Sequence, residues 1–472
     1  MKKVFVALAC AALCGCTAYP KKVRTVKTQL AMGVDEAAPV EYRAESLDGK
    51  NALLALQEQG RLWQLQGFWR KSAECYRKAM NFCDKESSGA VVSVGNTLRH
   101  SLASTYGNDL GLQYPIVPFE QMMLHTLDAF NALALSEWDN FGVNVRNIEA
   151  WRNGATEQMA RDVKDLTSKL GDKSDLLTSS KYSSAVNNAN CVVYGLKRST
   201  DNIYALYLSA LYHEIIGDYS NALIAWNDIE QIRPGLGSVK RGIDHSNGKA
   251  MEPGMGEVVM FFEEGFIPQK RNKRFEYGGL FTTIVSDMPY YSVFDCQPYV
   301  EGGPIVASED GHGVAMTTPL CDLAGLAVKA HQERLGGIMA RQYARTSIKA
   351  ITRGIFSGLA LAGAYCAANN IRDDKGYLQN ILLIVGIVGS IGTSIMAIST
   401  EHADLRSWLL LPRQIQIARF PMKAGNHRLK LETCDLSEEV DVEVKPGRIT
   451  VVHCTAVPNV MKAFSVCTDK IK

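Results

Sequence analysis

The sequence predicts an α+β protein of several domains, and three observations support this. Apolar residues recur at helical spacing over 51–84, 119–151 and 203–234. Two long uncharged stretches lie within 354–400. Short alternating segments separated by turns follow residue 405. We therefore expect a signal peptide (1–15), an N-terminal linker (16–44), a helical domain (45–245), a mixed α/β region (250–404) and a C-terminal β module (405–472).

The N-terminus carries the pattern of an export signal. Lys2 and Lys3 precede ten apolar residues, which is too short a run to span a bilayer as a helix. The segment ends in Leu-Cys-Gly-Cys at residues 13–16, which resembles a lipobox. This resemblance implies cleavage before Cys16 and attachment of acyl chains such as palmitate to that residue. The alternative is an ordinary secretory signal with incidental cysteines.

The residues after Cys16 suggest where the lipid would be held. By resemblance to the bacterial sorting rule, Thr17 in place of Asp indicates the outer membrane, with the protein facing the periplasm. Residues 17–27 contain four basic residues and no acid. We expect a tether beside an anionic membrane surface, or simply a solvated linker.

Two segments of the first half follow the spacing of the tetratricopeptide repeat, in which small residues sit where helices approach and aromatic residues fill the groove. Residues 51–84 and 203–234 show this pattern, and a degenerate helical pair lies between them with a turn near 136–141. We predict one α-solenoid over 45–245, since such repeats need neighbours to bury their faces. Its concave surface could bind a protein, or the helices could be scaffold only. The candidate partner-binding residues are Trp69, Tyr76, Tyr219 and Trp226.

A basic run follows the strongly apolar strand predicted at 255–264. Lys270, Arg271, Lys273 and Arg274 could hold an anion or an acidic partner. A solvated loop is the simpler interpretation.

The uncharged stretches 354–368 and 376–400 predict a helical hairpin, 354–400. The second arm is long enough to cross a membrane. Burial within the soluble fold is the alternative, because the first arm is short and outer membranes usually hold β-barrels. In the β module, four strands between 414 and 455 predict a small β-sandwich.

No segment carries a recognisable catalytic, zinc-binding or nucleotide-binding motif. A net charge of +2 gives no general attraction to nucleic acid. We therefore expect a protein that is not an enzyme, with no metal, cofactor or small-molecule substrate. An envelope hydrolase with an unrecognised site is an alternative.

The order of these parts resembles a family of uncharacterised bacterial lipoproteins with tetratricopeptide-like repeats and a C-terminal β module. The resemblance covers most of the chain, and the Asp-Leu-Arg-Ser-Trp segment at 404–408 is its specific part. The family carries no assigned activity. The matching residues are Gly265, Pro268, Lys270, Asp404, Leu405, Arg406, Ser407, Trp408, Leu411, Pro412, Ile415, Ala418, Arg419, Pro421, Ala424, Gly425 and His427.

These observations predict a membrane-anchored, periplasm-facing scaffold that binds proteins of the cell envelope. The alternative use of the 354–400 hairpin would make it a membrane-inserting or pore-associated subunit.

Overall fold

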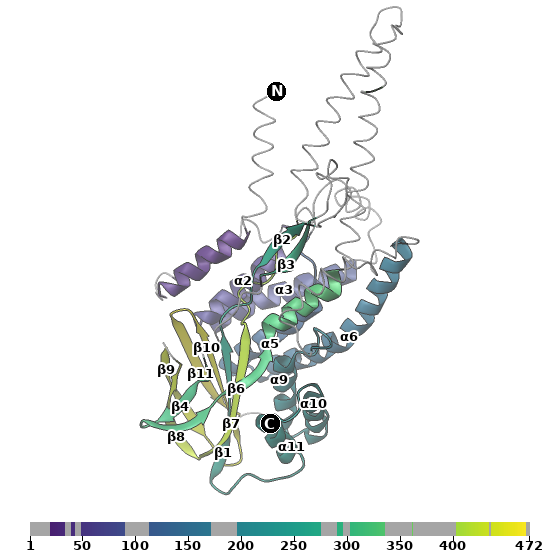
Figure 1. The fold of residues 1–472 in the computed structure, drawn as a ribbon. Coiled ribbons are helices and arrows are strands. Elements are labelled where there is room, and N and C mark those ends of the chain that lie inside the picture. Colours follow the sequence, from purple (N-terminus) through teal and green to yellow (C-terminus); the bar gives the residue numbers. More distant parts are fainter. Residues whose placement is uncertain are drawn as a thin grey trace, which may run out of the picture.

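The computed structural model describes residues 19–33, 39–42, 49–89, 113–170, 196–274, 290–295, 303–335, 361, 403–433 and 436–468. Helices dominate the first half of these residues and strands the second half, which confirms the α+β class (Figure 1). Cys16 lies outside the described residues, as does the predicted hairpin 354–400 apart from Leu361. In the described parts of the chain, we find no helix with the length and apolar character needed to cross a bilayer.

Three helical hairpins follow one another along the chain. They are α2 (Ala52–Leu65) with α3 (Trp69–Gly89), α5 (Pro118–Ala134) with α6 (Trp138–Leu170), and α9 (Ile203–Ile215) with α10 (Tyr219–Ile232). Neighbouring hairpins contact each other through α3 and α5 and through α6 and α9. A shorter helix, α11 (Gly237–Ser246), packs on α10. The helical pairs expected from the sequence are therefore present, including the degenerate one.

All three hairpins turn in the same way. Their first helices are followed by a residue with left-handed backbone, namely Gly67 (φ 82°), Ser136 (φ 55°) or Gly217 (φ 80°). The next N–H then donates to the carbonyl five positions earlier, as Phe68 does to Trp63, and this closes the helix end. Ser136 adopts a conformation that glycine takes without steric cost. This residue explains why the middle repeat is hard to recognise.

Two larger sheets form beside the helices. The five-stranded sheet has the order β11 (Val460–Cys467), β10 (Ile449–Val457), β1 (Met255–Glu264), β7 (Gln414–Lys423) and β6 (Thr318–Asp322). β1 and β10 run parallel, and the other neighbours are antiparallel. The four-stranded sheet has the order β5 (His312–Met316), β4 (Val306–Glu309), β8 (Gly425–Glu432) and β9 (Ser437–Val444). One apolar cluster, which includes Phe262, Leu431 and Val452, is shared between them.

The C-terminal strands do not form sheets by themselves, although we predicted a separate β module from residue 405 onward. β7 and β10 both pair with β1, and β8 pairs with β4. A helix over residues 323–335 follows β6 directly. The middle and C-terminal regions therefore share their sheets, because each supplies strands that the other needs.

Strand β1 packs against the first helices of the hairpins. The ring of Phe261 lies 5.2 Å from that of Phe130 on α5 and 5.5 Å from that of Tyr207 on α9, measured between centroids. Every residue of α5 from Phe119 to Leu133 is buried. The inner face of the helical array is thus covered by the protein's own sheet.

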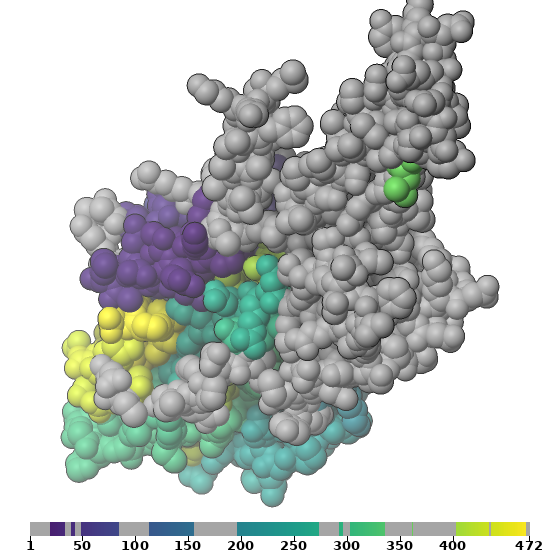
Figure 2. Space-filling view, turned by 45° about the horizontal axis from the view of Figure 1, so that its top comes forward, coloured from purple at the N-terminus to yellow at the C-terminus, as the bar shows by residue number. Residues whose placement is uncertain are grey.

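The segment expected to be a linker contains a docked helix. Residues 19–31 are helical, and Val23, Val26 and Leu30 are buried. They share an apolar cluster with Leu62 of α2 and with the C-terminal strands, here Val460. Figure 2 shows this helix (purple) lying on the surface against the last strands (yellow). The linker prediction for this part of 16–44 was wrong because apolar residues at helical spacing outweigh the basic ones.

A small pair of strands, β2 (Lys270–Arg274) and β3 (Tyr290–Phe294), lies apart from the larger sheets. It contains the basic run that we interpreted as a loop.

Candidate functional site

The four predicted partner-binding aromatic residues have different environments. Tyr76 and Trp226 are fully buried. A side chain at Gly60 or Gly242 would overlap with their rings, so these residues hold helices together. That part of the prediction was wrong, since neither ring can reach a partner. Trp69 is half-buried against Phe464, whereas Tyr219 is 45% exposed and is still available.

A buried ionic network joins α2 to the sheet. Arg61 lies 2.5 Å from Glu263 on β1, and both side chains are fully buried. Glu263 also accepts hydrogen bonds from the hydroxyls of Tyr204 (2.7 Å) and Thr455 (3.0 Å). Burial alone would raise the pKa of Glu263, but the charge of Arg61, the His453 imidazole 3.3 Å away and the Tyr204 hydroxyl hold it well below the usual range. We interpret this network as structural, because Arg61, Glu263, Tyr204 and Thr455 all bond to one another or to their neighbours inside the fold.

A second buried network lies between α9, α11 and the sheet. The guanidinium of Arg419 is 2.5 Å from Glu214 and 2.6 Å from Glu257. His245 contacts the same Glu214 carboxylate at 2.5 Å. Glu214, His245 and Glu257 could together offer a metal ion three ligand atoms within 4.8 Å of one another. The arginine already supplies the positive charge at this position, so we assign no metal site here.

Lys270 and the 404–406 segment meet beside β2. The Lys270 amine donates to the Arg406 carbonyl at 3.0 Å, and the Arg406 guanidinium pairs with Asp404 at 2.8 Å. Burial lowers the pKa of Lys270 to about 8. Burial and the nearby charge of Lys270 also lower the pKa of His331 to about 3. Lys270 is half-buried, and its amine is already engaged by the Arg406 carbonyl.

For the rest of the basic run, the structure describes the side chain of Arg271. Arg271 is exposed and pairs with Asp295 at 3.2 Å. Lys273 and Arg274 belong to β2, and their side chains lie outside the described residues.

The N-terminal helix is fastened to the body at Glu58. The Tyr19 hydroxyl donates to the Glu58 carboxylate and lies 2.5 Å from the Ser407 carbonyl. The same carboxylate accepts the backbone N–H groups of Leu409 (2.7 Å) and Leu410 (3.1 Å). Burial raises the pKa of Glu58 to about 7, although these hydrogen bonds lower it in part. The helix, α2 and the 407–410 segment thus share one buried carboxyl group.

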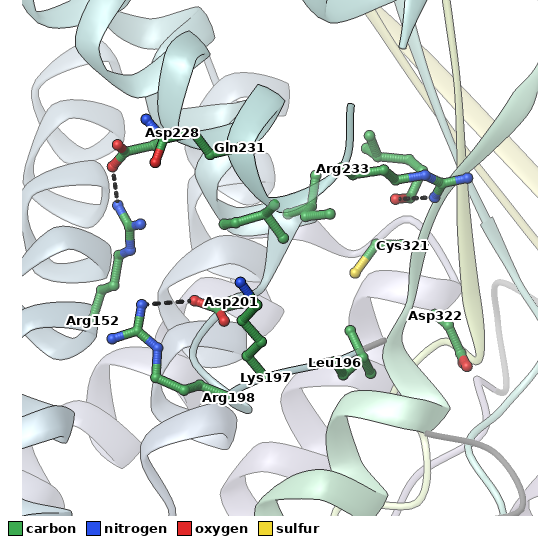
Figure 3. Close-up of a pocket in the computed structure, with 13 residues that line it drawn as sticks. Arg152, Leu196, Lys197, Arg198, Asp201, Asp228, Gln231, Arg233, Cys321 and Asp322 are labelled. Carbon is green, nitrogen blue, oxygen red and sulfur yellow. Dashed lines mark hydrogen bonds and ion pairs between the residues drawn. The ribbon is translucent and has the colours of Figure 1, made fainter. Parts of the chain in front are cut away.

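A cavity of about 680 Å³ opens between α6, α10 and β6 (Figure 3). Arg152 pairs with Asp228 at 2.7 Å, and Arg198 pairs with Asp201 at 3.1 Å. Burial raises the pKa of the Cys321 thiol in its wall to about 12, which leaves a weak nucleophile. The charged lining residues are Arg152, Lys197, Arg198, Arg233, Asp201, Asp228 and Asp322.

A smaller hollow of about 320 Å³ continues from this cavity along α6 and α10. Arg152 and Asp228 line both hollows. Ile224, which is 62% exposed, borders the smaller one, and Tyr219 precedes it on the same helix. We call the two hollows together the α6–α10 groove. Unlike the inner face of the helices, the groove is not covered by the sheet.

Comparisons of this chain with protein-family models, curated proteins and solved structures gave no match.

Sequence reasoning missed the residues that organise these sites. Glu58 and Arg61 look like solvated charges by residue type, but they sit within an otherwise apolar helix, ALLALQEQGRLWQL. Glu263 likewise lies one residue before the end of the apolar strand MGEVVMFFEE. A charged residue within an apolar segment could have indicated a buried ionic network, because charged side chains are rarely buried unless they are paired.

Proposed function

We propose that this protein is a non-enzymatic, lipid-anchored scaffold of the bacterial cell envelope, held through Cys16 at the periplasmic face of the outer membrane. The observation that carries the proposal is the fastening of Tyr19 to Glu58 and Ser407. Tyr19 follows Cys16 by only three residues. A lipid on Cys16 would therefore hold the folded body itself close to the membrane.

The protein-binding surface in this proposal is the α6–α10 groove. We interpret the three hairpins as a tetratricopeptide-like solenoid and the two sheets as a β-sandwich. Strand β1 covers the face that such repeats ordinarily offer to partners, as the ring contacts of Phe261 indicate. A partner would then bind to the second helices of the hairpins, and on one of these, α10, Tyr219 and Ile224 are exposed.

A second candidate function is membrane insertion by the 354–400 segment. One observation favours it. Ala403, which follows the segment, donates its N–H to Asn272 at 3.2 Å, close to where Arg406 meets Lys270. Tyr19 contacts Ser407 in the same stretch. The chain therefore returns from the apolar segment beside the point at which the lipid would be attached.

Membrane fractionation tests the anchor. The wild-type protein should take up labelled palmitate and stay in the membrane after sodium carbonate extraction, because acyl chains make anchoring stable. Cys16→Ser should abolish labelling, whereas the control Cys14→Ser should keep it. A wild-type protein that takes up no label would overturn the lipid anchor.

The same assay separates the two candidate functions. Residues 1–16 are replaced by a cleavable secretory leader, so that neither the lipid nor an uncleaved signal holds the protein. Release into the soluble fraction is expected for a scaffold anchored by lipid alone. If the protein instead stays in the membrane after carbonate extraction, and deletion of 354–400 releases it, then that segment inserts into the membrane.

Site-specific photo-crosslinking tests the binding surface. A photoreactive amino acid at Ile224 should give a discrete crosslinked species in intact envelopes, because this exposed position borders the α6–α10 groove. The same amino acid at Arg428, an exposed position on β8, is the control. Equal crosslinking at both positions, or none at Ile224, would remove the groove from the proposal.

A further inference from the structure

The helix over 19–31 has two distinct faces. Val23, Val26 and Leu30 form its buried face. Lys21 and Arg24 lie on the exposed face. Neither makes an ion pair with any residue in the described parts of the chain. The apolar face is already used for docking, so the basic face is left for an external partner.

The body holds this basic face in a fixed position. Hydrogen bonds of Tyr19 to Glu58 and Ser407 fasten the start of the helix. The Lys27 amine lies 4.3 Å from the centroid of the Phe266 ring. Lys27 therefore turns inward, whereas Lys21 and Arg24 turn outward.

Chain length limits the distance between this face and a lipid on Cys16. Three residues span at most about 11 Å between Cys16 and Tyr19. Lys21 and Arg24 lie only roughly 3 Å and 8 Å further along the helix axis, at the rise of an α-helix. The screening length at physiological salt is about 8 Å. These spans are upper limits, so the chain length allows both side chains to lie at the surface that holds the lipid.

The charge of the segment suits an anionic surface. From Cys16 to Gly33 the chain contains four basic residues and no acidic one. A basic residue next to an anionic bilayer strengthens binding by roughly fivefold. Acidic groups that would cancel this attraction are absent from the helix itself.

We infer that the exposed face of the 19–31 helix binds anionic lipid headgroups and thereby orients the body on the membrane. This inference rests on the proposed function, since the lipid on Cys16 brings the face to the bilayer. The occupant is the headgroup layer, and the recognising residues are Lys21 and Arg24.

Vesicle binding of the unlipidated chain tests the inference. The protein is produced from Thr17 onward, and its binding to vesicles of phosphatidylcholine with phosphatidylglycerol is compared with binding to phosphatidylcholine alone. Lys21→Gln with Arg24→Gln should weaken binding to the anionic vesicles by roughly thirtyfold. Added salt should reduce this difference, because it screens exposed charges.

A matched pair of substitutions provides the control. Lys240→Gln with Lys249→Gln removes the same charge on and just after α11, which lies away from the 19–31 helix (Figure 1). This variant should bind as the wild type does, and all variants retain 354–400, so its contribution cancels. Equal binding by wild type and the Lys21/Arg24 variant, or equal weakening in both pairs, would overturn the inference. Neither result would affect palmitate labelling at Cys16, which is measured separately.

Discussion

Replacing Arg61 by leucine should lower the free energy of unfolding by about 3–5 kcal/mol, because the buried Glu263 carboxylate would lose its guanidinium partner and keep the imidazole of His453, 3.3 Å away, in its place. The side chains of Arg61 and Glu263 are fully buried and lie 2.5 Å apart. Urea denaturation measures the loss. Glu263→Leu should have a similar effect, because it leaves the buried Arg61 guanidinium without its carboxylate partner.

The double variant makes this prediction specific. Arg61→Leu with Glu263→Leu should be more stable than the sum of the single losses implies, because neither charge is then left alone. Arg428 and Glu439 form an exposed pair on β8 and β9, with side chains 71% and 54% accessible. Removing either should change stability by less than about 1 kcal/mol. Additive losses at Arg61 and Glu263 would show that the pair does not act as a unit.

The helical pairs were predictable because their signals are local. Gly67 and Gly217 mark the turns, and both have the left-handed backbone that glycine adopts easily. Tyr76 and Trp226 mark the close helix contacts, although their burial excludes the binding role we expected. Local spacing predicts that a ring packs, but it does not say whether the ring stays accessible.

The placement of β1 could not be predicted in this way. Its apolar run indicates a buried strand, but its neighbours are β10 and β7, which lie far along the chain. Strand pairing depends on contacts between distant segments, and periodicity within one strand carries no information about them. The boundary at 405 was misplaced for this reason. The contact of Lys270 with Arg406 could not be predicted for the same reason, although the sequence pattern included both residues.

Replacing Arg419 by methionine should also destabilise the protein by about 3–5 kcal/mol near neutral pH. Glu214 and Glu257 would then face each other in a buried site without the guanidinium that now contacts both. Thermal or urea denaturation of the variant measures this loss. Arg241, which lies at the exposed edge of the same site, 3.6 Å from Glu257, is the matched control, and its replacement should have a much smaller effect.

The pH dependence of the variant distinguishes lost charge from lost packing. In the wild type, burial opposes but Arg419 dominates, so the pKa of Glu214 lies below its usual value. This contribution to stability is present above the unfolded pKa and is lost as the pH falls. Without Arg419, burial and the neighbouring Glu257 carboxylate should raise the pKa of Glu214 against the opposing contact of His245. The variant should then gain stability as the pH falls from neutrality. The contribution of Glu214 to the free energy of unfolding should therefore change with pH in opposite directions in the wild type and the variant. Parallel slopes would mean that Arg419 acts mainly through its packing on the Trp226 ring, whose centroid lies 5.5 Å away.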